Sequence, residues 1–347
     1  MNNAFLEEII KDFDKYQKNN PKFKHFNDNI KDFIENKFKL DDVINGLNKN
    51  IYQSGKKGKN SYIRKICQEE LMGTRVGQIF GGIKKFFYTN NNEINANFKK
   101  FKEFLSEIKS ILKSNDKNKR ERFKKLVIES FSKDALFSLK TVLIQILCCY
   151  FSAFLLPIYQ LEQMKNFIND LKIEPKKEQE IRIFKSKKDD DFGKKLLLLN
   201  KILISWKNKH HLMKKWSNLV FTHFLYMNLP LDDLKVLRKS KFGIEWLETN
   251  EQFVVTVFSK IHEKLVFKKI AVIRTNFPDC EVIDDNGNPK LIEFEFESSG
   301  ASSHKDDLKI CDYIVCWEDD KPDKVRKYNK NIEIISLKEE LRKMILN

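Results

Sequence analysis

The sequence predicts an α+β protein with two domains: an all-helical, basic domain over residues 1–235, followed by an α/β domain over residues 236–347 that is built on a central mixed sheet. Apolar residues recur with a helical period of about 3.6 through most of the first part. Strict alternation and short apolar runs, which are typical of strands, mark the second part. A chain of 347 residues is long enough to bury a core in each domain.

The charge of the chain is divided in the same way. Residues 1–240 contain 48 basic and 28 acidic residues, whereas residues 241–347 contain 17 basic and 21 acidic residues, within a total net charge of +16. A compositional bias toward lysine explains the number of lysines but not the shortage of acidic residues in the first part. The asymmetry indicates a polyanion-binding module beside a metal-binding one.

The first part opens with an amphipathic helix that ends at Asn19-Asn20-Pro21 and whose apolar stripe is Phe5, Leu6, Ile9, Ile10 and Phe13. A second amphipathic helix is predicted over residues 98–112, a solvated basic segment over 114–125, and a charged loop or linker over 174–191. The glycine-rich string at 73–82 has no preceding apolar strand and no Gly-Lys-Ser/Thr ending. It therefore predicts close helix packing rather than a phosphate-binding loop.

Residues 141–161 contain no charged side chain over about the ~20 positions that a membrane-spanning helix needs. Two interpretations follow, a buried helix of the basic domain or a membrane span. The polar and helix-breaking residues Gln145, Ser152, Pro157 and Gln160 favour the buried helix, so no membrane is expected as a partner. Six cysteines without metal-site spacing and a charged segment at residues 1–20 predict a reducing, cytoplasmic location.

Residues 196–229 return to a helical pattern in which Trp206 and Trp216 alternate with basic side chains. Interleaved aromatic and basic residues can stack on bases and pair with phosphates. The alternative, which the sequence slightly favours, is that the tryptophans are core residues and the lysines form a solvated face. A short helix after Pro230 then leads into the second domain.

In the second part, the strand predicted at residues 291–297 carries the most specific signal. Leu291, Glu293, Glu295 and Glu297 share one face, and Ile292, Phe294 and Phe296 share the other. Carboxylates that neighbour each other on one face repel and are usually avoided. A bound divalent cation is a physical reason for gathering them.

Other elements can be placed around this strand. The turn signal Asp284-Asp285-Asn286-Gly287-Asn288-Pro289 predicts a hairpin that pairs residues 280–284 with the glutamate strand and brings Asp279 beside the carboxylates. A helix is predicted at residues 249–258, a buried central strand at 313–317, and a final helix opened by the capping box Ser336-Leu337-Lys338-Glu339.

These residues resemble the PD-(D/E)xK, restriction-endonuclease-like nucleases. The motif is Pro278-Asp279, a hairpin, and then Glu293-Phe294-Glu295, in which glutamate stands where that family usually has lysine. The resemblance covers residues 247–346 and follows the order helix, Pro-Asp strand, hairpin, Glu-x-Glu strand, helix, apolar strand. It implies a restriction-endonuclease-like fold for residues 236–347.

The resemblance also implies roles for individual residues. Asp279 and Glu293 would bind Mg²⁺, or Mn²⁺ in its place, with the backbone carbonyl of Phe294 as a third ligand. Glu295 would bind a second metal or orient the attacking water, and Glu251 would add an outer contact. His304 and Lys305 follow the strand and would approach the phosphate, a role that the family does not fix.

Two functions are compatible with these residues. The first is a metal-dependent endodeoxyribonuclease of the restriction or defence kind, with DNA bound by the basic domain, RNA left open as a substrate, and a homodimer favoured if both strands of a duplex are cut. The second is a non-catalytic nucleic-acid-binding protein with a degenerate nuclease fold, free or membrane-tethered. In the second case, Glu295 and Glu297 are the wet face of an edge strand and Asp279 only caps a turn.

Overall fold

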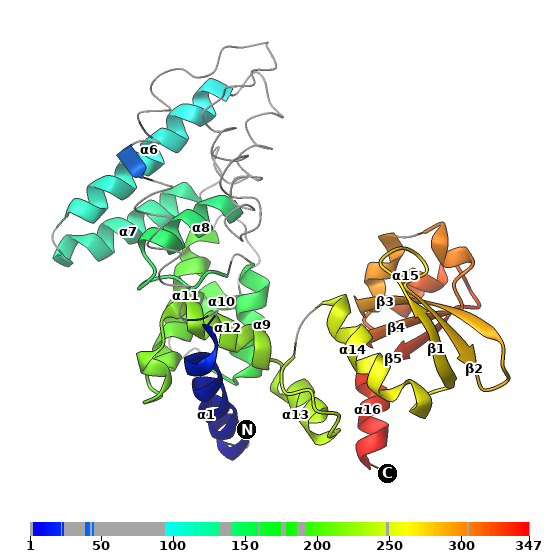
Figure 1. Ribbon diagram of the computed structural model, residues 1–347. Helices are drawn as coiled ribbons and strands as arrows, with labels where there is room; N and C mark the ends of the chain where they lie inside the picture. Colours follow the sequence, from blue (N-terminus) through cyan, green and yellow to red (C-terminus); the bar gives the residue numbers. More distant parts are fainter. Residues whose placement is uncertain are drawn as a thin grey trace. The chain divides into compact units, whose positions relative to one another are not determined.

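The computed structural model describes much of the chain in two compact units, Met1–Phe224 and Leu225–Asn347 (Figure 1). The described residues are 3–21, 23, 39–41, 44, 94–114, 116–131, 140–158, 160–174, 178–185, 192–247, 250–303 and 305–346. The glycine-rich string at 73–82, Cys67 and His304 lie outside these residues. The sequence placed the domain boundary at 235/236, whereas the compact units divide within a helix at 224/225.

The regular elements in the described part of the N-terminal unit are helices, as predicted. Its helices are α1 (Asn3–Asn19), α6 (Ile94–Lys113), α7 (Asp116–Ser130), α8 (Lys140–Tyr150), α9 (Leu161–Asp170), α10 (Glu178–Lys185), α11 (Phe192–Lys207) and α12 (Asn218–Asn228), the last of which crosses the boundary. A single 3-10 turn, Met213–Lys215, joins α11 to α12. The predicted stripe of α1 is buried at Leu6, Ile9, Ile10 and Phe13.

Two sequence predictions in this unit need correction, and a third is refined. The basic segment 114–125 carries exposed charged side chains as predicted, among them Arg120, Glu121 and Lys125, but α7 runs through it and buries Phe123. The charged segment 174–191 contains the helix α10. The apolar segment 141–161 is not one helix, because α8 ends at Tyr150 and an irregular, largely buried stretch follows it.

The burial expected of that apolar segment is confirmed. Leu143, Ile144, Leu147, Leu155 and Ile158 each have an exposed fraction of 0%. Among the described helices, none combines the length and the apolar character that crossing a bilayer requires.

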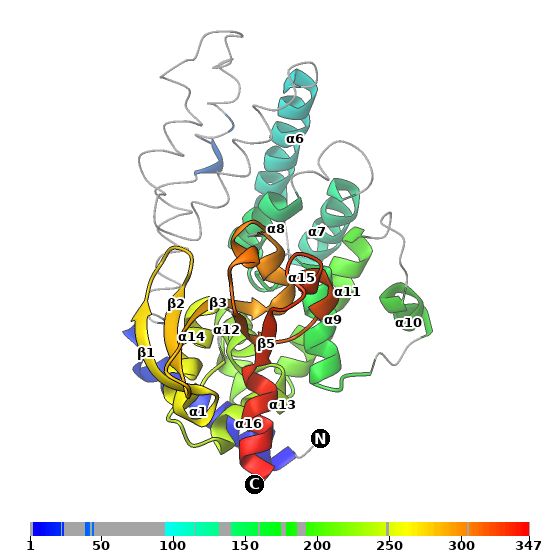
Figure 2. The same cartoon turned by 90° about the vertical axis from the view of Figure 1, so that its right-hand side faces the viewer.

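The C-terminal unit is a five-stranded mixed sheet with helices, as predicted (Figure 2). Its strands are β1 (Phe267–Ile273), β2 (Cys280–Asp284), β3 (Pro289–Glu297), β4 (Tyr313–Glu318) and β5 (Glu333–Ser336), and they lie side by side in chain order. The first three pair antiparallel, and β3, β4 and β5 pair parallel. Thus β3 is the central strand.

Helices α13 (Leu231–Lys239), α14 (Glu251–Ile261), α15 (Pro322–Arg326) and α16 (Leu337–Leu346) complete the C-terminal unit. The predicted α14 packs its aromatic side chains on one face of the sheet: Phe258 lies 5.2 Å from Phe294, and Phe253 lies 5.1 Å from Trp317, ring centre to ring centre. One of the two bonds of the predicted capping box is present at α16, where the amide of Glu339 donates to Oγ of Ser336 at 3.4 Å, whereas the carboxylate of Glu339 accepts Arg342 at 2.6 Å.

The opposite face of the sheet is covered by the segment between β3 and β4. Ile314 and Cys316 of β4 pack there with Ala301, Leu308 and Cys311. The sequence predicted a helix in this segment, but its described residues form two short 3-10 turns, Ser298–Ser303 and Asp307–Lys309. Glu293 pairs with Ile314 and Glu295 with Cys316 in the parallel register, so both carboxylates lie on this covered face.

Candidate metal-binding site

The β2–β3 hairpin sets the position of the first site residue. Its turn is held by Asp284, whose Oδ1 accepts the amides of Asn286 and Asn288 at 2.9 and 2.8 Å. Gly287 has a φ of +87°, a backbone conformation that favours glycine. The register then pairs Cys280 with Ile292, which places Asp279, one residue before β2, opposite Glu293.

Asp279 is anchored directly to the central strand. Its Oδ2 accepts a hydrogen bond from the amide of Phe294 at 2.9 Å. Its negative charge acts on both glutamates of the motif, because it raises the pKa of Glu293 and of Glu295. The sequence prediction that the hairpin brings Asp279 beside the carboxylates is therefore confirmed, and the residue does more than cap a turn.

Glu293 is the buried centre of the group. Its exposed fraction is 4%, and within the described part of the chain its Oε2 has no hydrogen-bond partner. Burial raises the pKa of Glu293 to about 8, helped by the charges of Asp279, Glu295, Asp307 and Glu251 in decreasing order. A carboxylate oxygen that is buried without a donor needs either a proton or a cation.

Glu295 lies two residues further along the same face and is partly buried. Burial, followed by the charges of Glu251 and Asp279, raises its pKa to about 7. Its carboxylate rests against Gly300 so closely that a Cβ at that position would collide with it. The interpretation of Glu295 as a residue of a wet edge strand is wrong, because β3 is central and the segment after it covers this side chain.

Glu251 comes from a different element, the first turn of α14. Asn250 caps that helix by accepting the amide of Phe253 at 2.9 Å. The aromatic contacts of α14 fix the helix on the sheet, and its first residue is close enough to repel both Glu293 and Glu295. The four residues named from the sequence, Glu251, Asp279, Glu293 and Glu295, thus belong to one electrostatically coupled group.

One acidic residue of this neighbourhood was missed from the sequence. Asp307, in the 3-10 turn before β4, also raises the pKa of Glu293. The acidic pair Asp306-Asp307 was a signal, but its distance from the motif in sequence hid its proximity. Lys305, which was expected near the phosphate, lies with its Nζ 5.7 Å from the ring centre of Tyr328.

The oxygen atoms of this acidic group can be compared with the ligands that a divalent cation requires. Within the described ranges, no group of three or more His, Cys, Asp or Glu side chains has an arrangement that could hold a metal ion. The set predicted from the sequence is smaller, two carboxylates and one backbone carbonyl. Its oxygens are the hard ligands that Mg²⁺ prefers, and the unpartnered Oε2 of Glu293 fits such an ion.

Two of the aromatic and basic residues of 196–229 have structural contacts in the core, whereas Lys209, Lys214 and Lys215 are exposed, as the alternative of a solvated face expects. Trp216 is buried, and its Nε1 donates to Oδ1 of Asp14 at 2.7 Å. Lys207 is also buried, with its Nζ 2.9 Å from both the carbonyl of Trp216 and Oδ1 of Asn218, and burial lowers its pKa. The interpretation of Trp216 as a core residue is confirmed, and Lys207 is not part of a solvated face.

Comparison of the chain with family models, with curated proteins and with solved structures gave no match.

Proposed function

We propose that this protein is a divalent-metal-dependent endonuclease that hydrolyses phosphodiester bonds of DNA. The observation that carries the proposal is the buried carboxyl group of Glu293, which has an oxygen without a hydrogen-bond partner among the described residues and whose pKa is raised by the charges of four other acidic side chains. Strongly perturbed pKa values of converging acidic groups are typical of functional sites.

Asp279 and Glu293 would hold the ion, with the carbonyl of Phe294 as the third ligand supplied by the chain. When bound, Mg²⁺ supplies a Lewis acid that activates water and offsets the charge of the phosphate. The hydrogen bond from Phe294 to Asp279 holds that carboxylate at a fixed place on β3. Because Glu293 is held on the central strand, neither ligand has to be ordered when the ion binds.

Glu295 is proposed as the base that accepts the proton of the attacking water. A general base works best when its pKa lies near the operating pH. In the metal-free chain, burial together with neighbouring charge raises the pKa of Glu295 to about 7, and a bound cation lowers it from there, which keeps the carboxylate ready to accept a proton. A carboxylate cannot supply the positive charge of the lysine usual at this position. Glu251, which repels Glu295 from α14, would then act on the ion or on its water shell.

The basic N-terminal unit suits DNA as the substrate. The excess of lysine and arginine in residues 1–240 matches the phosphate backbone, and binding through such contacts falls steeply with salt. The restriction or defence role remains part of this proposal, as do a homodimer for double-strand cuts and RNA as another substrate.

The test is incubation of the purified chain with supercoiled plasmid and with single-stranded DNA and RNA, in Mg²⁺, Mn²⁺ or EDTA. We expect Mg²⁺- or Mn²⁺-dependent nicking or linearisation of the plasmid and none in EDTA. Cutting of circular substrate demonstrates internal cleavage. Nucleic-acid binding without any metal-dependent cleavage would overturn the proposal.

One observation favours a second candidate, a non-catalytic nucleic-acid-binding protein. It is that, in the described part of the chain, no three metal-ligating side chains are grouped around one point. This candidate predicts salt-dependent binding that is indifferent to metal and to the substitutions Asp279→Ala and Glu293→Ala.

A further inference from the structure

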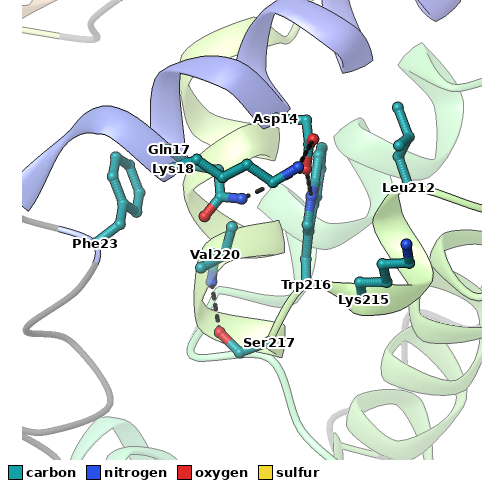
Figure 3. A pocket seen from close by; sticks show the side chains of 9 residues that line it. All are labelled: Asp14, Gln17, Lys18, Phe23, Leu212, Lys215, Trp216, Ser217 and Val220. Atoms are coloured by element: carbon teal, nitrogen blue, oxygen red, sulfur yellow. Dashed lines mark hydrogen bonds and ion pairs between the residues drawn. The ribbon is translucent and has the colours of Figure 1, made fainter.

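The described part of the N-terminal unit contains a pocket of about 240 Å³ between α1 and the start of α12 (Figure 3). Its walls come from two stretches far apart in sequence. The lining residues are Asp14, Gln17, Lys18, Phe23, Leu212, Lys215, Trp216, Ser217 and Val220. The acidic group of the C-terminal unit does not account for this pocket, whereas the interleaved aromatic and basic segment 196–229 supplies Trp216 and Lys215 to it.

The pocket has an apolar wall with a polar part held in place. Phe23, Trp216 and Val220 supply rings and methyl groups, and each is buried. Asp14 is fixed by three donors: Nε1 of Trp216 at 2.7 Å, Nζ of Lys18 at 2.5 Å and Nε2 of Gln17 at 3.5 Å. Burial opposes the charge of Asp14, but the hydrogen bonds from Lys18 and Trp216 outweigh it and lower its pKa.

The remaining polar groups favour an anion. The charge of Asp14 is balanced by Lys18, whereas Lys215 is exposed and, among the described residues, its ammonium forms no ion pair. The hydroxyl oxygen of Ser217 accepts the amide of Val220 at 3.2 Å, which leaves its proton for another acceptor. The helix α12 begins at Asn218 beside the pocket, so the positive end of its dipole also favours an anion there.

The volume of the pocket limits the size of the ligand that it can hold. A volume of about 240 Å³ lies below the roughly 300–1,000 Å³ of pockets that take drug-sized molecules, so a dinucleotide cofactor would not fit. A single planar base with one phosphate matches the combination of apolar wall, amide, hydroxyl and ammonium. Aromatic side chains and lysines together are the usual partners of such a unit.

We propose that this pocket binds one nucleotide unit, with its base against Phe23, Trp216 and Val220 and its phosphate at Lys215. The chemistry is the same for a free mononucleotide and for an unpaired nucleotide of a DNA strand. The site does not depend on the proposed nuclease activity, because every lining residue belongs to the N-terminal unit.

The test uses the full chain in EDTA, so that cleavage cannot interfere. Deoxynucleoside 5′-monophosphates, the corresponding nucleosides, inorganic phosphate and a short single-stranded oligonucleotide are titrated by calorimetry, and quenching of tryptophan fluorescence is followed in parallel. The variants are Lys215→Ala and Gln17→Ala. Lys209→Ala is the matched control, since Lys209 is an exposed lysine of the same region that does not line the pocket.

We expect Lys215→Ala to weaken binding of the nucleotide about tenfold, as loss of a charged hydrogen bond does, and Lys209→Ala to leave it within about twofold. Monophosphates that bind directly identify a free-nucleotide site, and binding of the oligonucleotide alone, with the same loss in Lys215→Ala, identifies a site for a strand. Equal losses in Lys215→Ala and Lys209→Ala, or binding of phosphate as strong as that of nucleotides, would overturn the proposal. The variant Asp279→Asn must bind nucleotide normally, which separates this result from a failure of the proposed nuclease.

Discussion

The amide of Phe294 donates to Oδ2 of Asp279 at 2.9 Å, so a residue outside the strands is tied to the middle of the central strand. The bond fixes the carboxylate without neutralising it. After burial, the charge of Asp279 is the largest cause of the raised pKa of Glu293, and it also contributes, after Glu251, to the raised pKa of Glu295. The site therefore combines fixed geometry with an unbalanced charge, which a cation would relieve.

The substitution Glu295→Gln is expected to lower the rate of metal-dependent cleavage by about 10²–10⁴, the range that a positioned general base contributes. The amide keeps the shape of the side chain but cannot accept the proton. Glu297→Gln is the matched control, because Glu297 lies on the same face of β3 but is exposed at its end. Single-turnover cleavage rates of the two variants make the comparison, and an equal loss in both would contradict the role of Glu295.

Gly300→Ala is expected to impair cleavage because its Cβ would collide with the carboxylate of Glu295. Because the collision involves the side chain of Glu295, the loss of stability caused by Gly300→Ala should be smaller in a Glu295→Ala background. A double-mutant cycle on the free energy of unfolding should give a coupling of about 0.5–3 kcal/mol. Additive effects would show that the two residues do not meet.

The metal-free protein is expected to lose stability as the pH rises from 5 to 8. The folded state keeps protons on Glu293 and Glu295 up to about pH 8 and 7, whereas the unfolded chain has released them above about 4.5. The folded state thus binds more protons in this interval, and the two shifts together lower the unfolding free energy by at most about 6 kcal/mol, less by the extent to which solvent screens the partly exposed Glu295.

Urea unfolding at several pH values in EDTA measures this slope. The double variant Glu293→Gln, Glu295→Gln should flatten it and be more stable than the native chain at pH 8. If the unfolding free energy depended on pH equally in both proteins, groups other than Glu293 and Glu295 would be responsible for that dependence.

Asp233→Ala is expected to destabilise the C-terminal unit by about 1–3 kcal/mol, because it leaves the buried indole N–H of Trp317 without its acceptor and removes one of the two acidic partners of Lys338. Oδ1 of Asp233 lies 3.1 Å from Nζ of Lys338, and Oδ2 accepts Nε1 of Trp317 at 3.1 Å. Asp232→Ala is the control, since this neighbour is exposed. Thermal or urea unfolding of the two variants, followed by tryptophan fluorescence and by circular dichroism, measures the difference in stability.

The sequence predicted the parts of the fold that depend on local patterns. The Asn-Gly turn, the alternation of residues 291–297 and the cap at Ser336 each act over a few residues. The turn and the strand are confirmed, as is the hydrogen bond that Ser336 accepts at the start of α16. The α7 helix was missed, because its lysines concealed a single buried face centred on Phe123.

The sequence predicted which acidic residues lie together in the site, but it did not predict how deeply they are buried. Hairpin register follows from the turn, which brings Asp279 opposite Glu293. The alternation of the strand grouped Glu293 with the other glutamates on one face but did not indicate that this face is covered. In the structure, the segment between β3 and β4 covers it and buries Glu293. Burial of this kind, like the approach of Asp307, arises from contacts between segments that no local pattern encodes.

The most direct test of the central claim is calorimetric titration of Mn²⁺ and Mg²⁺ into the purified chain at pH 7.5 without nucleic acid. We predict a site that is present in the native protein and in Glu297→Gln and is lost, or weakened at least tenfold, in Asp279→Asn and in Glu293→Gln. Equal binding in all four proteins, or none in the native chain, would contradict the proposal that Asp279 and Glu293 hold a divalent ion.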